Sequence, residues 1–185
     1  MATDAQRAVV WAKWLSAGHP MDPLRERTAA LFEEHSRYVW SVLRRMGVAE
    51  VDVEDVCQDV FLIAHRKLNE FEERSSSRTW IYGICLRVAA NYRRVGHRRR
   101  EQLWAAVPEQ STAMSEQALL LSELDRALGR LSDAKRAVFV LHEFAELSMV
   151  EISEVVGSPI KTCFSRLHAA RRELRSLLGA QSEHP

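Results

Sequence analysis

Apolar residues recur at the spacing of an α-helix along most of the chain. In the first half, this spacing predicts three helices, over residues 23–47, about 53–69 and about 79–95, with Gly47 ending the first. Their apolar stripes are, in order, Leu24, Leu31, Phe32, Val39, Val42, Leu43 and Met46; Val53, Val56, Val60, Ala64, the stem of Lys67 and Phe71; and Trp80, Ile81, Ile84, Cys85, Val88 and Tyr92. The pattern therefore predicts a helical bundle.

The helical pattern breaks off after residue 100 and resumes at Glu116. The segment between them contains Pro108 and many Ser, Thr and Gln residues, and it is acidic, so we interpret it as a linker. Ser132 is expected to cap a helix that follows. The apolar stripes after the linker are Leu119, Leu120, Leu124, Leu128 and Leu131, and then Ala137, Val138, Val140, Leu141 and Phe144.

These patterns predict an all-α protein of two small helical domains, 24–100 and 116–185, joined by a flexible acidic linker at 101–115. Residues 1–23 contain a short amphipathic segment that Gly18 and Pro20 end. This extension either packs on the main body or binds a partner.

The strongest local motif lies in the last third of the chain. Ser148 followed by Glu151 is a capping box that begins a short helix, and Gly157 ends that helix after about two turns. Ser158 is expected as the N-cap of a longer helix, with Pro159 at its first position. A short helix, a glycine turn and a capped longer helix are typical of a helix-turn-helix.

The second helix of this motif runs to about Leu178 and has two distinct faces. Cys163, Leu167, Ala170, Leu174 and Leu177 point inward, whereas Lys161, Ser165, His168, Arg172 and Arg175 point outward, flanked by Phe164 and Arg171. Lys161 lies in the first turn, where the helix dipole disfavours a cation unless a phosphate or base edge is bound there. The alternative is a helical hairpin with a solvated basic face.

Charge divides the first domain into two opposed segments. Residues 50–73 contain eight acids against two bases, whereas residues 74–100 contain eight arginines and no acid. Trp80, Tyr82 and Tyr92 lie among the arginines, and such a combination can hold phosphates and stack on unpaired bases. Leu62 falls within the acidic helix face, which suggests a protein-binding surface. Taken alone, an acidic helix face is usually just solvated.

Composition narrows the class of protein further. Apolar residues make up 46% of the chain, but no run of about 18 apolar residues would span a membrane, and no secretory signal is present. The three cysteines are far apart, and the histidines lack ligand spacing, so neither disulfides nor a metal site is expected. We expect a protein of the reducing cytoplasm, without cofactor and without the nucleophile or second acid cluster of an enzyme.

Two separate stretches resemble the extracytoplasmic-function class of bacterial RNA polymerase sigma factors. The stretch that resembles region 2 comprises residues 52–61 and 78–84. The stretch that resembles region 4 comprises residues 151–157, Thr162, residues 165–167, Ala170 and Arg171. Both motifs occur in the family's order and separation, and the resemblance covers roughly residues 24–178.

The resemblance implies a role for each surface. Asp52, Asp55, Gln58, Asp59 and Leu62 would dock on the β′ clamp helices of core RNA polymerase. Phe71, Arg74, Ser75, Ser76, Ser77, Arg78, Trp80, Tyr82, Arg87, Asn91 and Arg94 would recognise and melt the minus-ten promoter element. Lys161, Thr162, Phe164, Ser165, Arg166, His168, Arg171 and Arg172 would read the minus-thirty-five element. Contact with the polymerase β flap and control by an anti-sigma factor are also implied.

Several positions have two interpretations or depart from the family pattern. Trp80 is expected first as a core residue, with Tyr82 nearer to an unpaired base. His168 contacts DNA or is simply exposed. Phe164 departs from the commonest recognition-helix pattern, and Arg87 stands where relatives often have Asn.

Two other functions remain open. A duplex-binding regulator would use the helix-turn-helix as a dimer at palindromic sites, but it leaves the acidic face and the basic aromatic segment unexplained. An adaptor would bind polymerase or an anti-sigma factor without initiating transcription. The departure at Arg87 and the serine-rich loop at 74–77 keep this second alternative open.

Overall fold

The computed structural model describes residues 22–71, 76–102 and 116–179. All regular secondary structure in these residues is helical, which confirms the predicted fold class. The elements are α2 (Pro23–Arg45), α3 (Val53–Lys67), the 3-10 helix η1 (Leu68–Glu70), α4 (Ser77–Gln102), α5 (Glu116–Arg130), α6 (Asp133–Glu143), α7 (Met149–Val156) and α8 (Ile160–Gly179). The expected extension at 1–21 and linker residues 103–115 lie outside the described residues.

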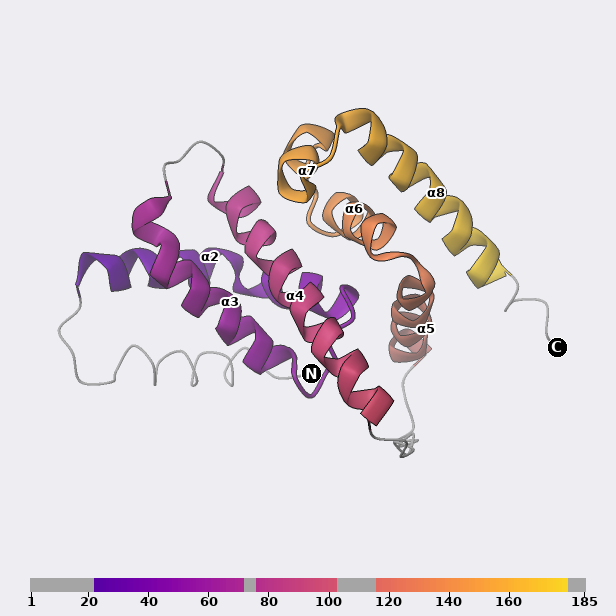
Figure 1. Cartoon of the computed structure of the whole chain (residues 1–185), viewed down its shortest axis with the longest axis horizontal. Helices are drawn as coiled ribbons and strands as arrows, with labels where there is room; N and C mark the ends of the chain where they lie inside the picture. Colours follow the sequence, from indigo (N-terminus) through magenta and orange to yellow (C-terminus); the bar gives the residue numbers. More distant parts are fainter. Residues whose placement is uncertain (1–21, 72–75, 103–115, 180–185) are drawn as a thin grey trace.

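Helices α2, α3 and α4 form a first bundle (Figure 1). Helix α2 begins as predicted, because Asp22 accepts a hydrogen bond from the backbone N–H of Arg25 at 2.7 Å and Pro23 occupies the first turn. The helix ends just before Gly47, whose φ of +92° is a left-handed conformation that glycine adopts without strain. The fully buried core includes Val39, Leu43, Val60, Phe61, Ala64, Ile81, Tyr82, Cys85 and Ala89.

Helix α4 is longer than the sequence pattern indicated. It runs from Ser77 to Gln102 rather than over about 79–95, and it therefore includes the first two residues assigned to the linker. A single glycine, Gly96, does not end it, because arginine, glutamate and glutamine are good helix formers and offset the modest loss. The prediction that this helix ends at about residue 95 was wrong, because no helix-stopping signal follows until the segment with Pro108.

Helices α5 to α8 form a second bundle, in which α8 packs on α6 and α7 (Figure 1). Cys163, Leu167, Ala170 and Leu174 are buried as predicted. Cys57, Cys85 and Cys163 are all buried and free, which confirms their interpretation as small core residues.

Two predicted caps differ in detail. Helix α8 begins at Ile160, and the carbonyl of Pro159 accepts the backbone N–H of Cys163 at 3.1 Å, so Pro159 takes the place expected for Ser158. The Ser158 hydroxyl instead accepts a hydrogen bond from Arg166 at 2.9 Å. Ser132 does stand at the N-cap of α6, but its side chain makes no capping bond.

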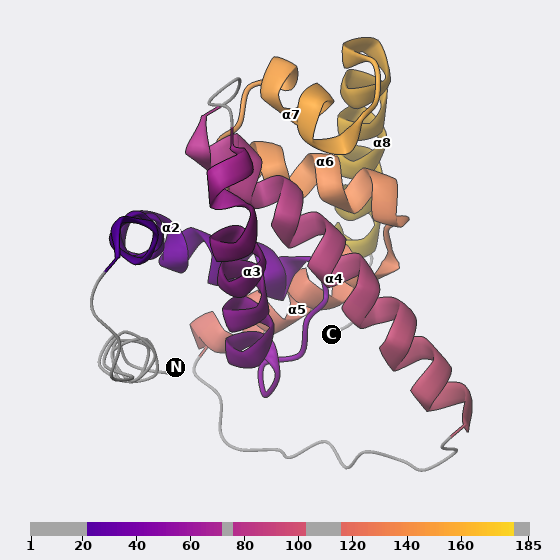
Figure 2. The ribbon, with the colours of Figure 1, turned by 60° about the vertical axis from the view of Figure 1, so that its left-hand side comes forward.

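The two bundles pack against each other, with α7 beside α4 and with α5 and α6 beside α2 (Figures 1 and 2). Arg136 of α6 lies at the centre of this contact and is only 5% exposed. Its guanidinium donates to the carbonyl of Met46 in the first bundle at 3.3 Å and to that of Gly129 in its own bundle at 2.7 Å. A side chain at Gly47 would meet the same guanidinium, since a Cβ there would lie 2.8 Å from Nη1.

Other contacts reinforce the same interface. The Arg45 guanidinium lies over the ring of Phe144, 3.9 Å from its centroid, and Arg44 forms an ion pair with Asp125 at 3.4 Å. Burial raises the pKa of Asp125, while the two arginines act in the opposite direction. The predicted pair of helical units is thus confirmed, but the two share one continuous hydrophobic core.

Candidate nucleic-acid interface and acidic docking face

The acidic face of α3 forms as the sequence predicts. Asp55 and Asp59 are exposed, while Gln58 and Leu62 are half-buried beside them. Asp52 differs from the others, because it accepts a short hydrogen bond from the hydroxyl of Tyr92 and so ties the start of α3 to α4. The exposed part of this face is therefore carried by carboxylates, with a partly accessible leucine at its edge.

The start of α4 is fixed by the serines that precede it. The Ser76 hydroxyl accepts the backbone N–H of Thr79 at 3.1 Å and also contacts the Thr79 hydroxyl at 2.8 Å, so Ser76 caps the helix. Ser77 hydrogen-bonds the ring of buried His35 at 3.2 Å. Arg74 and Ser75, predicted to contact DNA, lie outside the described residues.

The aromatic residues near this loop lie differently from the prediction. Trp80 is half-buried and packs against Phe71, with ring centroids 4.9 Å apart. Tyr82 is fully buried, and burial raises its pKa to about 12. Tyr82 is therefore not accessible to an unpaired base in this arrangement, contrary to the expectation, because its ring lies in the core that α4 shares with its neighbours.

The four arginines of α4 whose side chains the structure describes fall into two groups. Arg87 and Arg94 are exposed, as is Asn91. Among the described residues, Arg87 donates to the Gly83 carbonyl at 3.0 Å and Arg94 to Asn91 at 2.9 Å, both within α4. Arg78 and Arg93 instead reach the second bundle. Arg78 donates a short hydrogen bond to the carbonyl of Ala145, and Arg93 pairs with Asp133 at 3.0 Å.

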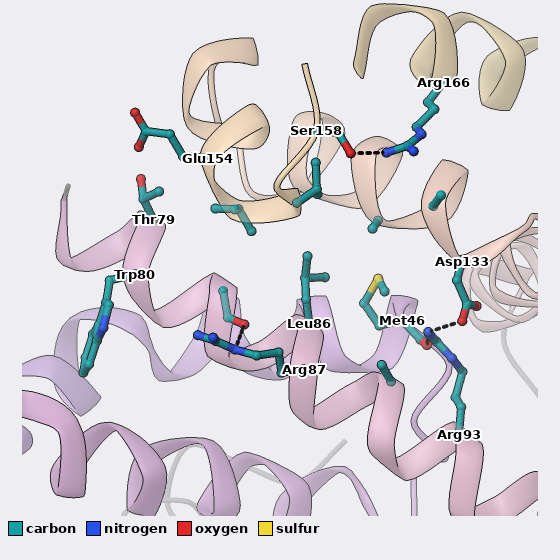
Figure 3. Close-up of a pocket in the computed structure, with 16 residues that line it drawn as sticks. Met46, Thr79, Trp80, Leu86, Arg87, Arg93, Asp133, Glu154, Ser158 and Arg166 are labelled. Atoms are coloured by element: carbon teal, nitrogen blue, oxygen red, sulfur yellow. Dashed lines mark hydrogen bonds and ion pairs between the residues drawn. The ribbon is translucent and has the colours of Figure 1, made fainter. Parts of the chain in front are cut away.

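A groove of about 590 Å³ separates α4 from the second bundle (Figure 3). Trp80, Leu86 and Arg87 line it from α4, while Glu154 lines it from α7. At one end of α4, Thr79 donates to the carboxylate of Glu151 at 3.2 Å. Part of the predicted minus-ten surface thus faces the helix-turn-helix across a narrow gap.

The helix-turn-helix has the predicted local geometry. Ser148 and Glu151 form a reciprocal capping box, in which the Ser148 N–H donates to Glu151 at 2.8 Å and the Glu151 N–H donates to the Ser148 hydroxyl at 3.3 Å. The serine hydrogen bonds hold the pKa of Glu151 below its usual value. Gly157 adopts the left-handed conformation at φ +61°, and the Ser153 hydroxyl closes the turn by donating to the Ser158 carbonyl at 2.8 Å.

The outer face of α8 is open. Every residue predicted to point outward is exposed: Lys161, Ser165, His168, Arg172 and Arg175, together with Phe164. Thr162, Arg166 and Arg171 are half-buried. Arg166 lines the groove toward α4, and Arg171 pairs with Glu143 of α6 at 2.9 Å, so neither belongs to the fully open surface.

Two further features bear on the class of protein. Among the described residues, no group of three or more His, Cys, Asp or Glu side chains is arranged to hold a metal ion. None of the helices in residues 22–71, 76–102 and 116–179 is long and apolar enough to cross a membrane.

The sequence matches two models of the sigma-70 family in the order that the fold suggests. Sigma-70 region 2 matches residues 31–100, which cover most of the first bundle. Sigma-70 region 4 matches residues 121–174, which include the helix-turn-helix. The fold and the paired models define the class as a bacterial-type RNA polymerase sigma factor.

Two known sigma factors show by their sequence similarity where the chain belongs within that class. The RNA polymerase sigma factor CnrH of Cupriavidus metallidurans is 31% identical over 83% of this chain and 87% of its own length. The ECF RNA polymerase sigma-E factor of Escherichia coli is 31% identical over 66% of this chain and 72% of its own length. The chain belongs to the extracytoplasmic-function sigma factors.

Solved structures agree with this fold. CnrH, in complex with the cytosolic domain of CnrY, superposes with a TM-score of 0.68 at 26% identity over 96% of this chain and 99% of that one. The sigma factor RpoE of Bartonella quintana, in complex with the anti-sigma factor NepR, has a TM-score of 0.65 at 22% identity over 80% of this chain and 94% of that one. At 22% identity, the similarity to RpoE supports the fold alone.

Proposed function

We propose that this chain initiates transcription through three surfaces, one for polymerase and two for promoter DNA. The first domain, 24–100, docks on core polymerase and melts the minus-ten element, and the second, 116–185, reads the minus-thirty-five element. The observation that carries the proposal is the coexistence of an exposed acidic face on α3 with an open basic face on α8. A duplex-binding regulator needs only the second.

Docking is assigned to Asp55 and Asp59, with Gln58 and Leu62 at the edge of the contact. Exposed carboxylates are free to meet basic helices, and a partly accessible leucine can add apolar contact. Asp52 contributes by fixing the start of α3 through its bond with Tyr92. Charge complementarity of this kind governs the rate and register of association more than the affinity alone.

Melting is assigned to the exposed arginines of α4 and to the aromatic pair beside the loop. Arg87 and Arg94 can follow the phosphates of a displaced strand. Trp80 and Phe71 offer the partly accessible rings, and stacking of this kind contributes about 1–3 kcal/mol per base. This surface supports capture of an unpaired base without Tyr82.

Upstream recognition is assigned to the open face of α8. Lys161, His168 and Arg172 lie on one face of the second helix of a helix-turn-helix, which is the element that enters the major groove in this motif. The chain performs this work as a subunit of polymerase in the cytoplasm, with no catalytic step of its own. Control by an anti-sigma protein is part of the proposal, since CnrH is solved in complex with the cytosolic domain of CnrY and RpoE in complex with the anti-sigma factor NepR.

The test is run-off transcription with purified core polymerase and a pool of genomic promoter fragments. We expect new transcripts that depend on this chain and start downstream of one shared bipartite sequence. The double variant Asp55→Arg with Asp59→Arg is expected to lose core binding and transcription while its helical content is unchanged. Glu33→Arg is the matched control, since Glu33 is also exposed, on α2.

Three results distinguish the alternatives. Unchanged core affinity in the double variant would remove the docking assignment. Stable core binding without any transcript would favour an adaptor. Neither binding nor transcript would leave a duplex-binding regulator as the better account.

A further inference from the structure

The first turns of α8 expose two large apolar side chains. Ile160 is 40% exposed and Phe164 is 46% exposed, although the remaining apolar positions of α8 are buried or half-buried. The two residues are four apart, so they lie side by side on the helix surface. A single exposed phenylalanine needs no explanation, but this pair stands on the face that the motif presents to DNA.

The charges around the pair fit a polyanion. Lys161, His168 and Arg172 are exposed on the same side of α8. The one acid of the helix, Glu173, is engaged elsewhere, in an ion pair with Lys135 of α6. An apolar spot on the same side of α8 as the exposed cations Lys161 and Arg172 is therefore complementary to a major groove, in which phosphates line an edge that carries both polar and apolar groups.

The chemistry of base-pair edges determines which base Ile160 and Phe164 can recognise. Guanine, adenine and cytosine present hydrogen-bond donors and acceptors in the major groove, and thymine adds the C5-methyl group, to which apolar side chains bind. Phe164 has no donor or acceptor, so it discriminates between bases only through apolar contact.

We propose that Phe164, supported by Ile160, selects a T·A base pair in the upstream promoter element by packing on the thymine C5-methyl group. The inference rests on the proposed function of α8 and assigns it one specific base preference. Lys161 and Arg172 then act mainly on phosphates or neighbouring base edges and set the register in which Phe164 meets its base.

A protein partner is the other class of occupant for this surface. The two side chains form a small apolar area on a face that also carries exposed Lys161 and Arg172, whereas the core of a protein interface is depleted of charge. The observations therefore favour DNA, and a protein partner becomes one outcome of the test.

The experiment uses the holoenzyme on a promoter mapped by run-off transcription. Each thymine of the upstream element is replaced in turn by deoxyuridine, which lacks only the C5-methyl group. We expect one position at which promoter affinity falls about fourfold, the effect of leaving one methyl group unburied. Phe164→Ala is expected to lose a similar factor on the thymine promoter and to show no further loss with deoxyuridine.

Two more variants separate this contact from general binding. Phe164→Leu, which keeps an apolar side chain, is expected to retain part of the sensitivity to deoxyuridine. Arg175→Ala is the matched control on the same exposed face, and it should weaken all promoters alike while keeping the full sensitivity. Helical content and melting temperature of each variant should match those of the parent, because both changed residues are exposed.

Several results would overturn the inference. Insensitivity of the parent holoenzyme to deoxyuridine at every position would remove the thymine contact but leave the sigma function intact. Equal sensitivity in the parent and in Phe164→Ala would assign the methyl group to another residue. Normal transcription by Phe164→Ala, combined with lost binding of the anti-sigma protein, would assign the pair to a protein interface. A holoenzyme that yields no promoter-dependent transcript would remove the proposed function and this inference together.

Discussion

The two helices proposed to meet promoter DNA, α4 and α8, differ in how much of their surface is free. On α4, Arg78, Thr79 and Arg93 are bonded to the second bundle, through Ala145, Glu151 and Asp133 respectively. On α8, the outward side chains from Lys161 to Arg175 are exposed. The outer face of α8 is thus open in this arrangement, whereas part of α4 is engaged by the second bundle.

This difference shows what full use of α4 requires. Arg78 and Arg93 can contact DNA only after they exchange their present partners for phosphates. Separation of the helix-turn-helix from α4 would free these arginines and would also open the groove lined by Trp80 and Arg87. Substitution of the residues that hold the two bundles together is therefore the most direct way to change the difference in accessibility between α4 and α8.

Arg136→Ala is expected to have the largest effect on the arrangement. It removes charged hydrogen bonds to backbone carbonyls on both sides of the contact, and we expect the free energy of unfolding to fall by about 3 kcal/mol. Urea denaturation measures the loss, and small-angle scattering should show a larger radius of gyration. The control is Arg130→Ala, which changes an exposed arginine nearby. Equal scattering curves for Arg136→Ala and the parent would mean that Arg136 does not hold the bundles together.

Trp80→Ala and Tyr82→Phe test the division of aromatic roles on α4. Because Trp80 is partly accessible, its loss should weaken open-complex formation by about 1–3 kcal/mol, the contribution of one stacked base. Tyr82→Phe keeps the buried ring and should leave promoter melting near that of the parent. Fluorescence of 2-aminopurine in the minus-ten element measures both. A strong melting defect in Tyr82→Phe alone would restore the original expectation for Tyr82.

Lys161→Ala and Arg172→Ala test whether the open face of α8 contacts promoter DNA. We expect at least one of them to weaken promoter use by about 1–3 kcal/mol if it contacts a base edge. A phosphate contact would instead weaken all sequences alike and reduce the salt slope of binding by about one. Competition assays over a set of single-base promoter variants distinguish the two. No effect from either substitution would contradict the assignment of this face to DNA.

The Arg93–Asp133 ion pair should have the smallest effect. Arg93 is 18% exposed but Asp133 is 70% exposed, so solvent screens the pair, and its coupling should be below about 1 kcal/mol. A double-mutant cycle with Arg93→Ala and Asp133→Ala measures the coupling in urea. A value several times larger would show that this pair, and not Arg136, dominates the contact between the bundles.

Local interactions explain which parts of the fold and site could be predicted from the sequence. The capping box of Ser148 and Glu151, the left-handed Gly157 and the two faces of α8 each depend on residues within a few positions of one another. The acidic face of α3 follows from the same helical periodicity. Such features form in the same way whatever the rest of the chain does, so the sequence alone determined the helix-turn-helix, the family and two of the three surfaces.

Tertiary packing decided the rest. Helical periodicity identifies one buried stripe, but it does not say how many neighbours a helix has. Helix α4 packs against α2 and α3 in its own bundle and against α7 in the other, and Tyr82 is buried. The same packing engages Arg78 and Arg93 with the second bundle and directs Arg166 into the groove. The contacts of Arg93 and Arg78 join residues 40 and 67 positions apart, respectively. Only the folded chain brings such residues together, because their partners depend on how the two bundles meet.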